Sequence, residues 1–251
     1  VQLDGAVMEV EQREKAVGLW REAVSARRQA DARQAAAQAR ADVMDAAKAS
    51  PVVRQYAEKL AAENAALVER RNGPKGLIAR IDKVSEDLRR IESSLKMVKD
   101  EFTRARQKAE SLGSSNAVGI MLRQSGTHLP DLREHRRNLR IRQSEIAAIQ
   151  TERVGLGEQR ASMANIESTL RELVPPIEDP ALQQQQTRLS ASLRGLLKAK
   201  RDALDALMDD YDALFEKLVD ADAKERELIA ETGRFEQFID ERVLWIRSNG
   251  L

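Results

Sequence analysis

The sequence predicts an all-α protein, an elongated antiparallel coiled-coil helical bundle with about five long helices and one short helix. Of its 251 residues, 33% are charged and only 3% are aromatic, which is typical of long helices that bury a narrow apolar stripe. Clusters of aromatic and β-branched residues, which favour strands, are missing. Apolar residues instead recur at alternating spacings of three and four, the heptad pattern of a left-handed coiled coil.

The six prolines divide the chain, because proline is poorly tolerated inside a helix. All of them lie in turn-like contexts: Ser50-Pro51, Asn72-Gly73-Pro74, Leu129-Pro130-Asp131, Val174-Pro175-Pro176 and Asp179-Pro180. Connections this short make successive helices antiparallel. We therefore expect a single elongated helical domain over residues 1–251, with sub-bundles at 1–74 and 75–251.

The clearest heptad seam predicts one helix over 77–112, where apolar residues follow one another without a skip. The last segment keeps the same rhythm over 204–239, and Glu225 interrupts it. Segment 131–173 is expected to be helical in the same register. Its skipped positions hold arginines: Arg142, Arg153 and Arg160. Polar residues weaken a seam locally but help to fix its register.

The remaining elements are shorter or less sharply defined. A helix after Pro51 is expected to end at Asn72-Gly73, a good C-terminal signal. A short helix is expected from Ala117 to about Gln124, and another helix is expected to start at Asp179-Pro180. In the first fifty residues a weaker apolar stripe is formed by Leu3, Val10, Val17, Trp20 and Val24.

Composition excludes several classes of function. Forty-two basic residues against 41 acidic ones leave a formal net charge of +1, so nothing overall requires a polyanionic partner, and we expect no nucleic acid. The absence of cysteine excludes disulfides and thiolate chemistry. The N-terminus lacks a basic and apolar leader, and no run of about 18 apolar residues occurs. We expect a soluble segment in which a signal peptide is either absent or already removed.

No motif for catalysis is present. The two histidines, His128 and His135, stand without a metal-ligand pattern around them. Phosphate loops, nucleophile elbows and zinc-protease motifs are absent. Paired carboxylates are common, but on highly charged helices they indicate a solvated surface. We expect no enzyme activity and no cofactor.

A cluster of arginines near the start of segment 131–173 is the main candidate for a binding surface. It contains Arg133, Arg136, Arg137 and Arg140, and the same run extends to Arg142. The cluster could pair with acidic residues of the last helix, which is rich in aspartate between 202 and 222, or it could form an anion patch for phosphate, lipid head groups or nucleic acid. Aromatic residues for stacking bases are not interleaved with it. We therefore favour pairing within the protein over nucleic acid.

The C-terminal segment is the most distinctive. Residues 235–248 concentrate two phenylalanines, a tryptophan and several branched aliphatics in a very polar chain. They either cap one end of the bundle or approach a membrane, where Trp and Arg favour the interface. The candidate membrane-proximal residues are Leu244, Trp245 and Arg247.

Two segments carry a resemblance to a known family. Residues 238–248, FIDERVLWIRS, resemble the "LDE-x-x-LW" segment that precedes the first membrane helices of large MscS-type mechanosensitive channels, the KefA/MscK-like members. Upstream, Leu112-Gly113, Leu122-Arg123-Gln124 and Leu129-Pro130 resemble that family's "LG … LR-x-x-R … LP" segment. The chain thus resembles the N-terminal periplasmic helical domain of such a channel.

The resemblance implies a fragment of a larger inner-membrane protein that releases ions and small solutes under hypo-osmotic stress. Its partners would be the transmembrane and pore region of its own parent chain, a homo-oligomer that is typically a heptamer, with cell-wall or other periplasmic contacts. The fragment would act as a spacer, lever or sensor in the periplasm. No gating residue carries over, because no matching position belongs to the pore. The alternative is a free-standing coiled-coil scaffold or tethering protein. Periodicity also leaves open whether the seams close within one chain or between two.

Overall fold

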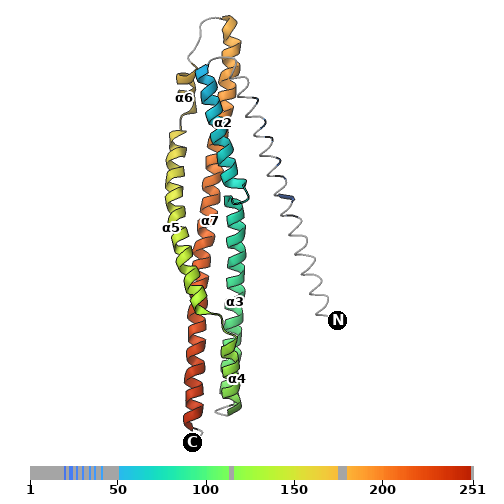
Figure 1. Ribbon diagram of the computed structural model, residues 1–251, viewed down its shortest axis with the longest axis vertical. Helices are drawn as coiled ribbons and strands as arrows, with labels where there is room; N and C mark the ends of the chain where they lie inside the picture. Colours follow the sequence, from blue (N-terminus) through green and yellow to red (C-terminus); the bar gives the residue numbers. More distant parts are fainter. Residues whose placement is uncertain are drawn as a thin grey trace. The chain divides into compact units, whose positions relative to one another are not determined.

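A computed structural model of the chain describes residues 51–112, 116–174 and 180–249, with eight isolated helical positions between Trp20 and Ala41. Helices occupy the described stretches and no strand occurs there, so the all-α bundle prediction is confirmed (Figure 1). The helices are α2 (Pro51–Asn72), α3 (Leu77–Leu112), α4 (Asn116–Thr127), α5 (Leu132–Ser162), α6 (Ile166–Leu173) and α7 (Pro180–Asn249). Most of the apolar stripe expected in the first fifty residues lies outside the described residues; Trp20 and Val24 are helical.

Most helix boundaries agree with those predicted from the sequence. The ends of α3 and the start of α7 lie where the heptads and Pro180 predict them, and α4 is three residues longer than expected at its C-terminal end. The end of α2 has a steric reason. The backbone amide of Gly73 donates to the Glu69 carbonyl oxygen at 2.7 Å, and a Cβ atom on Gly73 would stand only 2.5 Å from that oxygen. Only glycine fits this approach.

The expected continuous helix over 131–173 is wrong. The chain breaks between α5 and α6, where the side chain of Asn165 accepts a hydrogen bond from the backbone amide of Ser168 at 3.1 Å. Asparagine is among the strongest N-cap residues because its side chain satisfies an amide that the helix leaves unpaired. A local cap therefore starts a new helix inside an apolar pattern that continues on both sides.

The chain forms two compact units, each assembled from two separate stretches of sequence. Of the described residues, the first unit contains those up to Ala79 together with Leu156–Met208, and the second contains Arg80–Gly155 together with those from Asp209 onward. Each unit has its own core. The unit boundaries fall inside α3, α5 and α7, so each of these helices has residues in both units.

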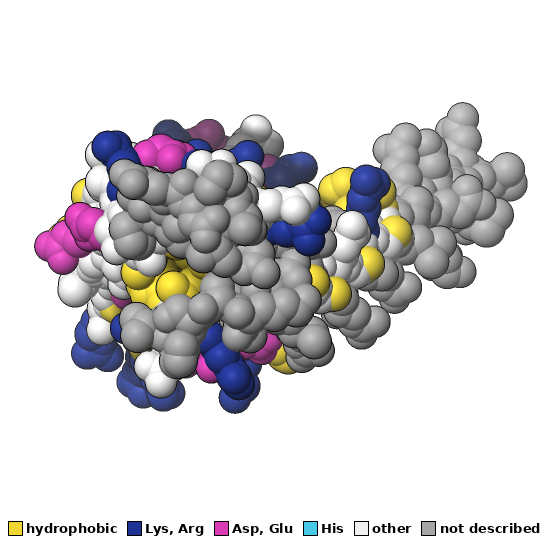
Figure 2. All heavy atoms as spheres, turned by 90° about the horizontal axis from the view of Figure 1, so that it is seen from above, with side chains coloured by type: hydrophobic (Ala, Val, Ile, Leu, Met, Phe, Trp, Pro, Cys, Tyr) yellow, Lys and Arg dark blue, Asp and Glu magenta, His cyan; other side chains and the backbone are white. Residues whose placement is uncertain are grey.

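The core of the first unit lies where α2 and α6 pack on the first part of α7. Small and branched apolar residues of α2 meet four leucines of α7 there, and Leu170 of α6 completes the cluster. Two polar contacts fix α2 on α7. The buried Asn64 amide donates to the Leu196 carbonyl oxygen at 2.9 Å, and Lys200 pairs with Glu63 at 2.6 Å. In the space-filling view from above, most charged side chains of the described residues lie around the edge (Figure 2).

The core of the second unit follows the heptads of α3 and α7. Every seam position of α7 from Tyr211 to Ile239 is buried, including the polar Glu225 and Thr232. The rings of Phe102 and Phe235 stack with their centroids 5.0 Å apart. Residues of α4 join this cluster through Val118 and Leu122, which are likewise buried. The seam read from the sequence is thus the packed face of the helix.

Candidate functional site

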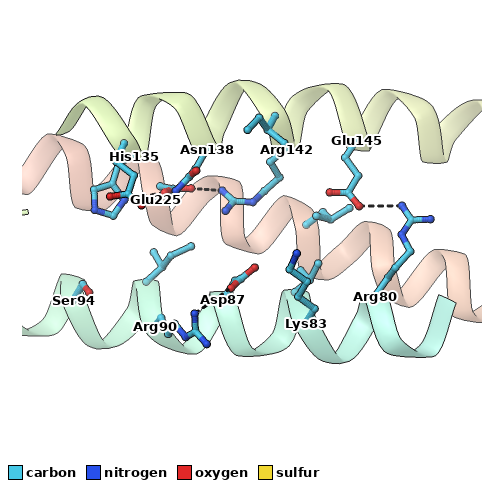
Figure 3. A pocket seen from close by; sticks show the side chains of 15 residues that line it. Arg80, Lys83, Asp87, Arg90, Ser94, His135, Asn138, Arg142, Glu145 and Glu225 are labelled. Atoms are coloured by element: carbon cyan, nitrogen blue, oxygen red, sulfur yellow. Dashed lines mark hydrogen bonds and ion pairs between the residues drawn. The ribbon is translucent and has the colours of Figure 1, made fainter. Parts of the chain in front are cut away.

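A groove in the second unit has a volume of about 540 Å³. One wall is α3 from Arg80 to Ser94, the other is α5 from Glu134 to Glu145, and α7 contributes Leu218 and Glu225. Figure 3 shows Arg80 opposite Glu145 at one end and Ser94 near His135 at the other. Residue numbers rise along α3 as they fall along α5, so these two helices run antiparallel.

Glu225 lies at the bottom of this groove and is only 1% exposed. Its Oε1 is 2.8 Å from Nδ1 of His135, and its Oε2 accepts a hydrogen bond from Arg142. Both partners come from α5, so one carboxylate of α7 is held by two side chains that lie about two helix turns apart. A buried carboxylate needs such partners, because removing it from water without them is costly.

The charges of the groove balance. Arg80, Lys83, Arg90 and Arg142 face four carboxylates, those of Asp87, Glu134, Glu145 and Glu225. Several of these groups already pair with each other, as Arg80 does with Glu145 at 2.9 Å. A groove with balanced and internally paired charges presents no excess field for an anion or a cation. Its chemistry suits helix–helix register better than ligand capture.

The arginines at the skipped seam positions of α5 all point to acids of α7. Within the second unit Arg142 pairs with Glu225, and Arg153 pairs with Asp212 at 2.5 Å. Within the first unit Arg160 pairs with Asp205. Arg153 also lies over the ring of Phe215, 5.4 Å from its centroid. Each interruption of the seam in α5 is thus matched by an acid on the facing helix.

The arginine cluster identified in the sequence is not part of these contacts between α5 and α7. Arg133, Arg136, Arg137 and Arg140 are exposed on the first turns of α5. The polar contacts that α5 makes with acids of α7 in this unit come instead from His135, Arg142 and Arg153. Among the described residues, no salt bridge involves the four clustered side chains.

The C-terminal segment divides its side chains between two faces of α7. Ile239 and Ile246 are buried in the core of the second unit, while Leu244 is 63% exposed and Trp245 is 44% exposed. The guanidinium group of Arg242 lies 4.7 Å from the centroid of the Trp245 ring and donates to the Ala109 carbonyl oxygen at 3.2 Å. Arg247 belongs to α7, but its side chain lies outside the described residues.

The ion pair between Lys99 of α3 and Glu227 of α7 shifts the pKa values of both side chains. Lys99 donates to Glu227 at 2.6 Å, and Lys224 donates to the other oxygen of the same carboxylate at 3.1 Å. These hydrogen bonds lower the pKa of Glu227 below its ordinary value, and the bond that Lys99 donates to Glu227 raises the pKa of Lys99. Both groups are therefore charged near neutrality.

Neither a metal centre nor a membrane span is found in the described parts of the chain. No three or more histidine or acidic side chains converge there in a way that could hold a metal ion. None of the helices described combines the length and the apolar character needed to cross a membrane.

Comparisons with known proteins give no match. No protein-family model, no curated protein and no solved structure is similar to this chain at a significant level.

Proposed function

We propose that this chain is a non-catalytic helical spacer that transmits displacement between its ends, and that it serves as the periplasmic extension of an inner-membrane mechanosensitive channel of the MscS type. The observation that supports a spacer is the buried seam of α7, which continues without an exposed position from Tyr211 to Ile239. The channel assignment rests on the resemblance of residues 238–248 and of the upstream segments.

A packed helix suits this role for a mechanical reason. The part of α7 in the second unit, from Asp209 to Asn249, has about 40 residues and is roughly 60 Å long. Bending it would pull buried side chains such as Leu214 and Phe235 out of contact with their neighbours. Helix bends have identifiable causes such as proline, and α7 contains no proline after Pro180.

The exposed end of α7 supports the expected orientation. Leu244 and Trp245 are large apolar side chains left in contact with solvent, and Arg242 stacks on the tryptophan ring. Tryptophan and arginine are favoured at the boundary between membrane and water. In the proposal, this end faces the membrane while the rest of the chain remains in the periplasm.

The test is a hinge placed in α7 of the full-length parent protein. Ala223 is exposed, so Ala223→Pro interrupts the helix without removing a core side chain, and Ala223→Gln is the matched control. We expect the proline variant to shift the membrane tension at which the channel opens, with the glutamine variant unchanged. If the proline variant opens at the same tension and survives hypo-osmotic shock as well as the wild-type protein, the proposal that α7 transmits displacement is refuted.

The alternative function is a free-standing scaffold or tether, and it predicts different coding sequence around this segment than the channel extension does. Reading the parent gene on both sides of this segment separates the two functions. A leader upstream and apolar spans directly after residue 251 are expected for the channel extension. A reading frame that lacks both would reject it in favour of the scaffold.

A further inference from the structure

Four arginines on one face of α5 form a basic stripe: Arg133, Arg136, Arg137 and Arg140. Their spacings of three, one and three residues place them on neighbouring positions of the same helix surface. All four are exposed, and within the described residues none forms a salt bridge. The stripe is therefore a concentration of positive charge that the described chain does not neutralise.

This arrangement is unfavourable in isolation. Like charges three and four residues apart repel, and Arg133 and Arg136 lie near the positive end of the helix dipole. The contrast with other cations of the same unit is clear, because Arg80, Lys99 and Arg153 each pair with an acid on a facing helix. An acidic surface would offset the repulsion.

The same unit carries such a surface on α7. Asp209, Glu216 and Asp220 are exposed at spacings of seven and four residues, which place them on one face, and we call them the acidic stripe. Neighbouring acids are already occupied, since Asp212 pairs with Arg153 and Asp222 with Arg226. In the described residues no ion pair involves the acidic stripe.

Each stripe also borders an exposed aliphatic side chain. Ile141 is 56% exposed and lies four residues after Arg137, while Val219 is 41% exposed and lies three residues after Glu216. These spacings place each aliphatic beside its stripe. Helices that pair specifically combine an apolar contact with flanking side chains of opposite charge.

The two stripes cannot meet within one chain. The pairs Arg153–Asp212 and Arg142–Glu225 fix the axial position of α5 on α7. Because the two helices run antiparallel, the basic stripe lies level with α7 residues beyond Glu225. The acidic stripe lies on the other side of Glu225, toward Asp209.

We propose that the basic stripe of one copy docks on the acidic stripe of a second copy of this chain. The contact joins two different surfaces, so it is heterologous. A second copy is favoured over an anionic ligand because the complement, with its own exposed aliphatic, is present on the same unit. This inference goes beyond the proposed function and does not depend on it.

The test is sedimentation velocity of the full chain at about 50 mM and about 500 mM salt, since the higher concentration screens exposed charges. One variant reverses the basic stripe (Arg136→Glu, Arg137→Glu, Arg140→Glu) and another the acidic stripe (Asp209→Lys, Glu216→Lys, Asp220→Lys). A control reverses three exposed cations of α3 (Arg89→Glu, Lys96→Glu, Lys108→Glu). Far-ultraviolet circular dichroism verifies that each variant is folded.

We expect the wild-type chain to self-associate at low salt, with affinity at least about tenfold weaker at high salt. Each stripe reversal should weaken association by a similar factor, and the control should not. A mixture of the two reversed variants should associate again, because each then supplies the complement of the other.

Three results would overturn the proposal. The first is a chain that stays monomeric at low salt, and the second is a mixture of folded variants that fails to restore association. The third is association that the basic reversal abolishes while the acidic reversal leaves it intact, which would assign the basic stripe to a different acidic surface of the second copy.

Discussion

Glu225 is the residue that sets how α5 and α7 meet in the second unit. It occupies a core position of the α7 seam, and its carboxylate is satisfied by His135 and Arg142. A buried ion pair adds little net stability over apolar residues, but it penalises every alignment that leaves the charge unpaired. One carboxylate can thereby select a single axial alignment of two long heptad helices.

The first prediction concerns this carboxylate. Glu225→Ala leaves Arg142, with its side chain 11% exposed, without its partner, and should lower the free energy of unfolding by about 3–5 kcal/mol. Replacing both residues (Glu225→Leu with Arg142→Leu) should recover most of that loss, since no buried charge remains. Urea unfolding monitored by circular dichroism measures both changes.

The matched control is Glu236→Ala, on the exposed face of the same helix, which should change stability by no more than about 0.5 kcal/mol. Equal losses for Glu225→Ala and Glu236→Ala would contradict the role given to the buried carboxylate.

The sequence shows that Glu225 and Arg142 are unusual at their positions, but it does not show that they contact each other. Glu225 is visible as an interruption of one seam and Arg142 as a skipped position in another. Pairing them requires the axial offset between α5 and α7, and a heptad pattern repeats identically every two turns. His135 carries no sequence signal at all, because a lone histidine among arginines has the same neighbours whether its ring is buried or exposed.

At the scale of elements, the sequence predicts a helix well where an apolar seam and a helix-breaking residue indicate the same boundary. A seam and a helix-breaking residue are both present for α3, which fills the interval that its apolar run defines, and for α2, which ends at Asn72, just before Gly73. The break at Asn165 escapes the same reasoning, because Met163 and Ile166 continue the apolar pattern across it. A side-chain cap is a local hydrogen bond, and apolar spacing does not reveal whether it forms.

A second prediction concerns the contact between α3 and α7 at Lys99 and Glu227. The lowered pKa of Glu227 means that the carboxylate stabilises the folded state above the ordinary glutamate pKa of about 4.3. That contribution is lost as the pH falls through the lowered pKa. The raised pKa of Lys99 keeps the cation charged throughout this range.

Lys99→Met should therefore be less stable than the wild-type chain at neutral pH. The two proteins should converge in acid, once Glu227 is protonated in the folded state. Lys96→Met, an exposed lysine of α3, is the control and should follow the wild-type chain at every pH. Thermal unfolding from neutral to acid pH provides the measurement, and a Lys99→Met difference that persists undiminished in acid would contradict this assignment.

At the scale of the whole molecule, the folded chain is divided into units that sequence order does not reveal. Residues of α5 and α7 are shared between both units, so neither unit is a continuous stretch of chain. Prolines locate turns, but only packing shows which helix returns to which core. The all-α class followed from composition and periodicity, whereas this division depends on contacts between residues more than a hundred positions apart, such as Asn64 and Leu196.

Heptad patterns also do not distinguish seams that close within one chain from seams that close between chains. Two lysine–glutamate contacts between helices distant in sequence, Lys99–Glu227 in the second unit and Lys200–Glu63 in the first, make this distinction measurable. Each brings an ammonium nitrogen within 2.6 Å of a carboxylate oxygen. A carbodiimide converts such contacts into amide bonds.

The decisive measurement is carbodiimide cross-linking of an equal mixture of ordinary and isotopically heavy chains, followed by mass spectrometry of the linked peptides. We predict linked peptides for Lys99–Glu227 and for Lys200–Glu63 in which both halves carry the same isotope. Absence of these peptides, or a statistical mixture of isotopes in them, would contradict the intrachain helical bundle described for this protein.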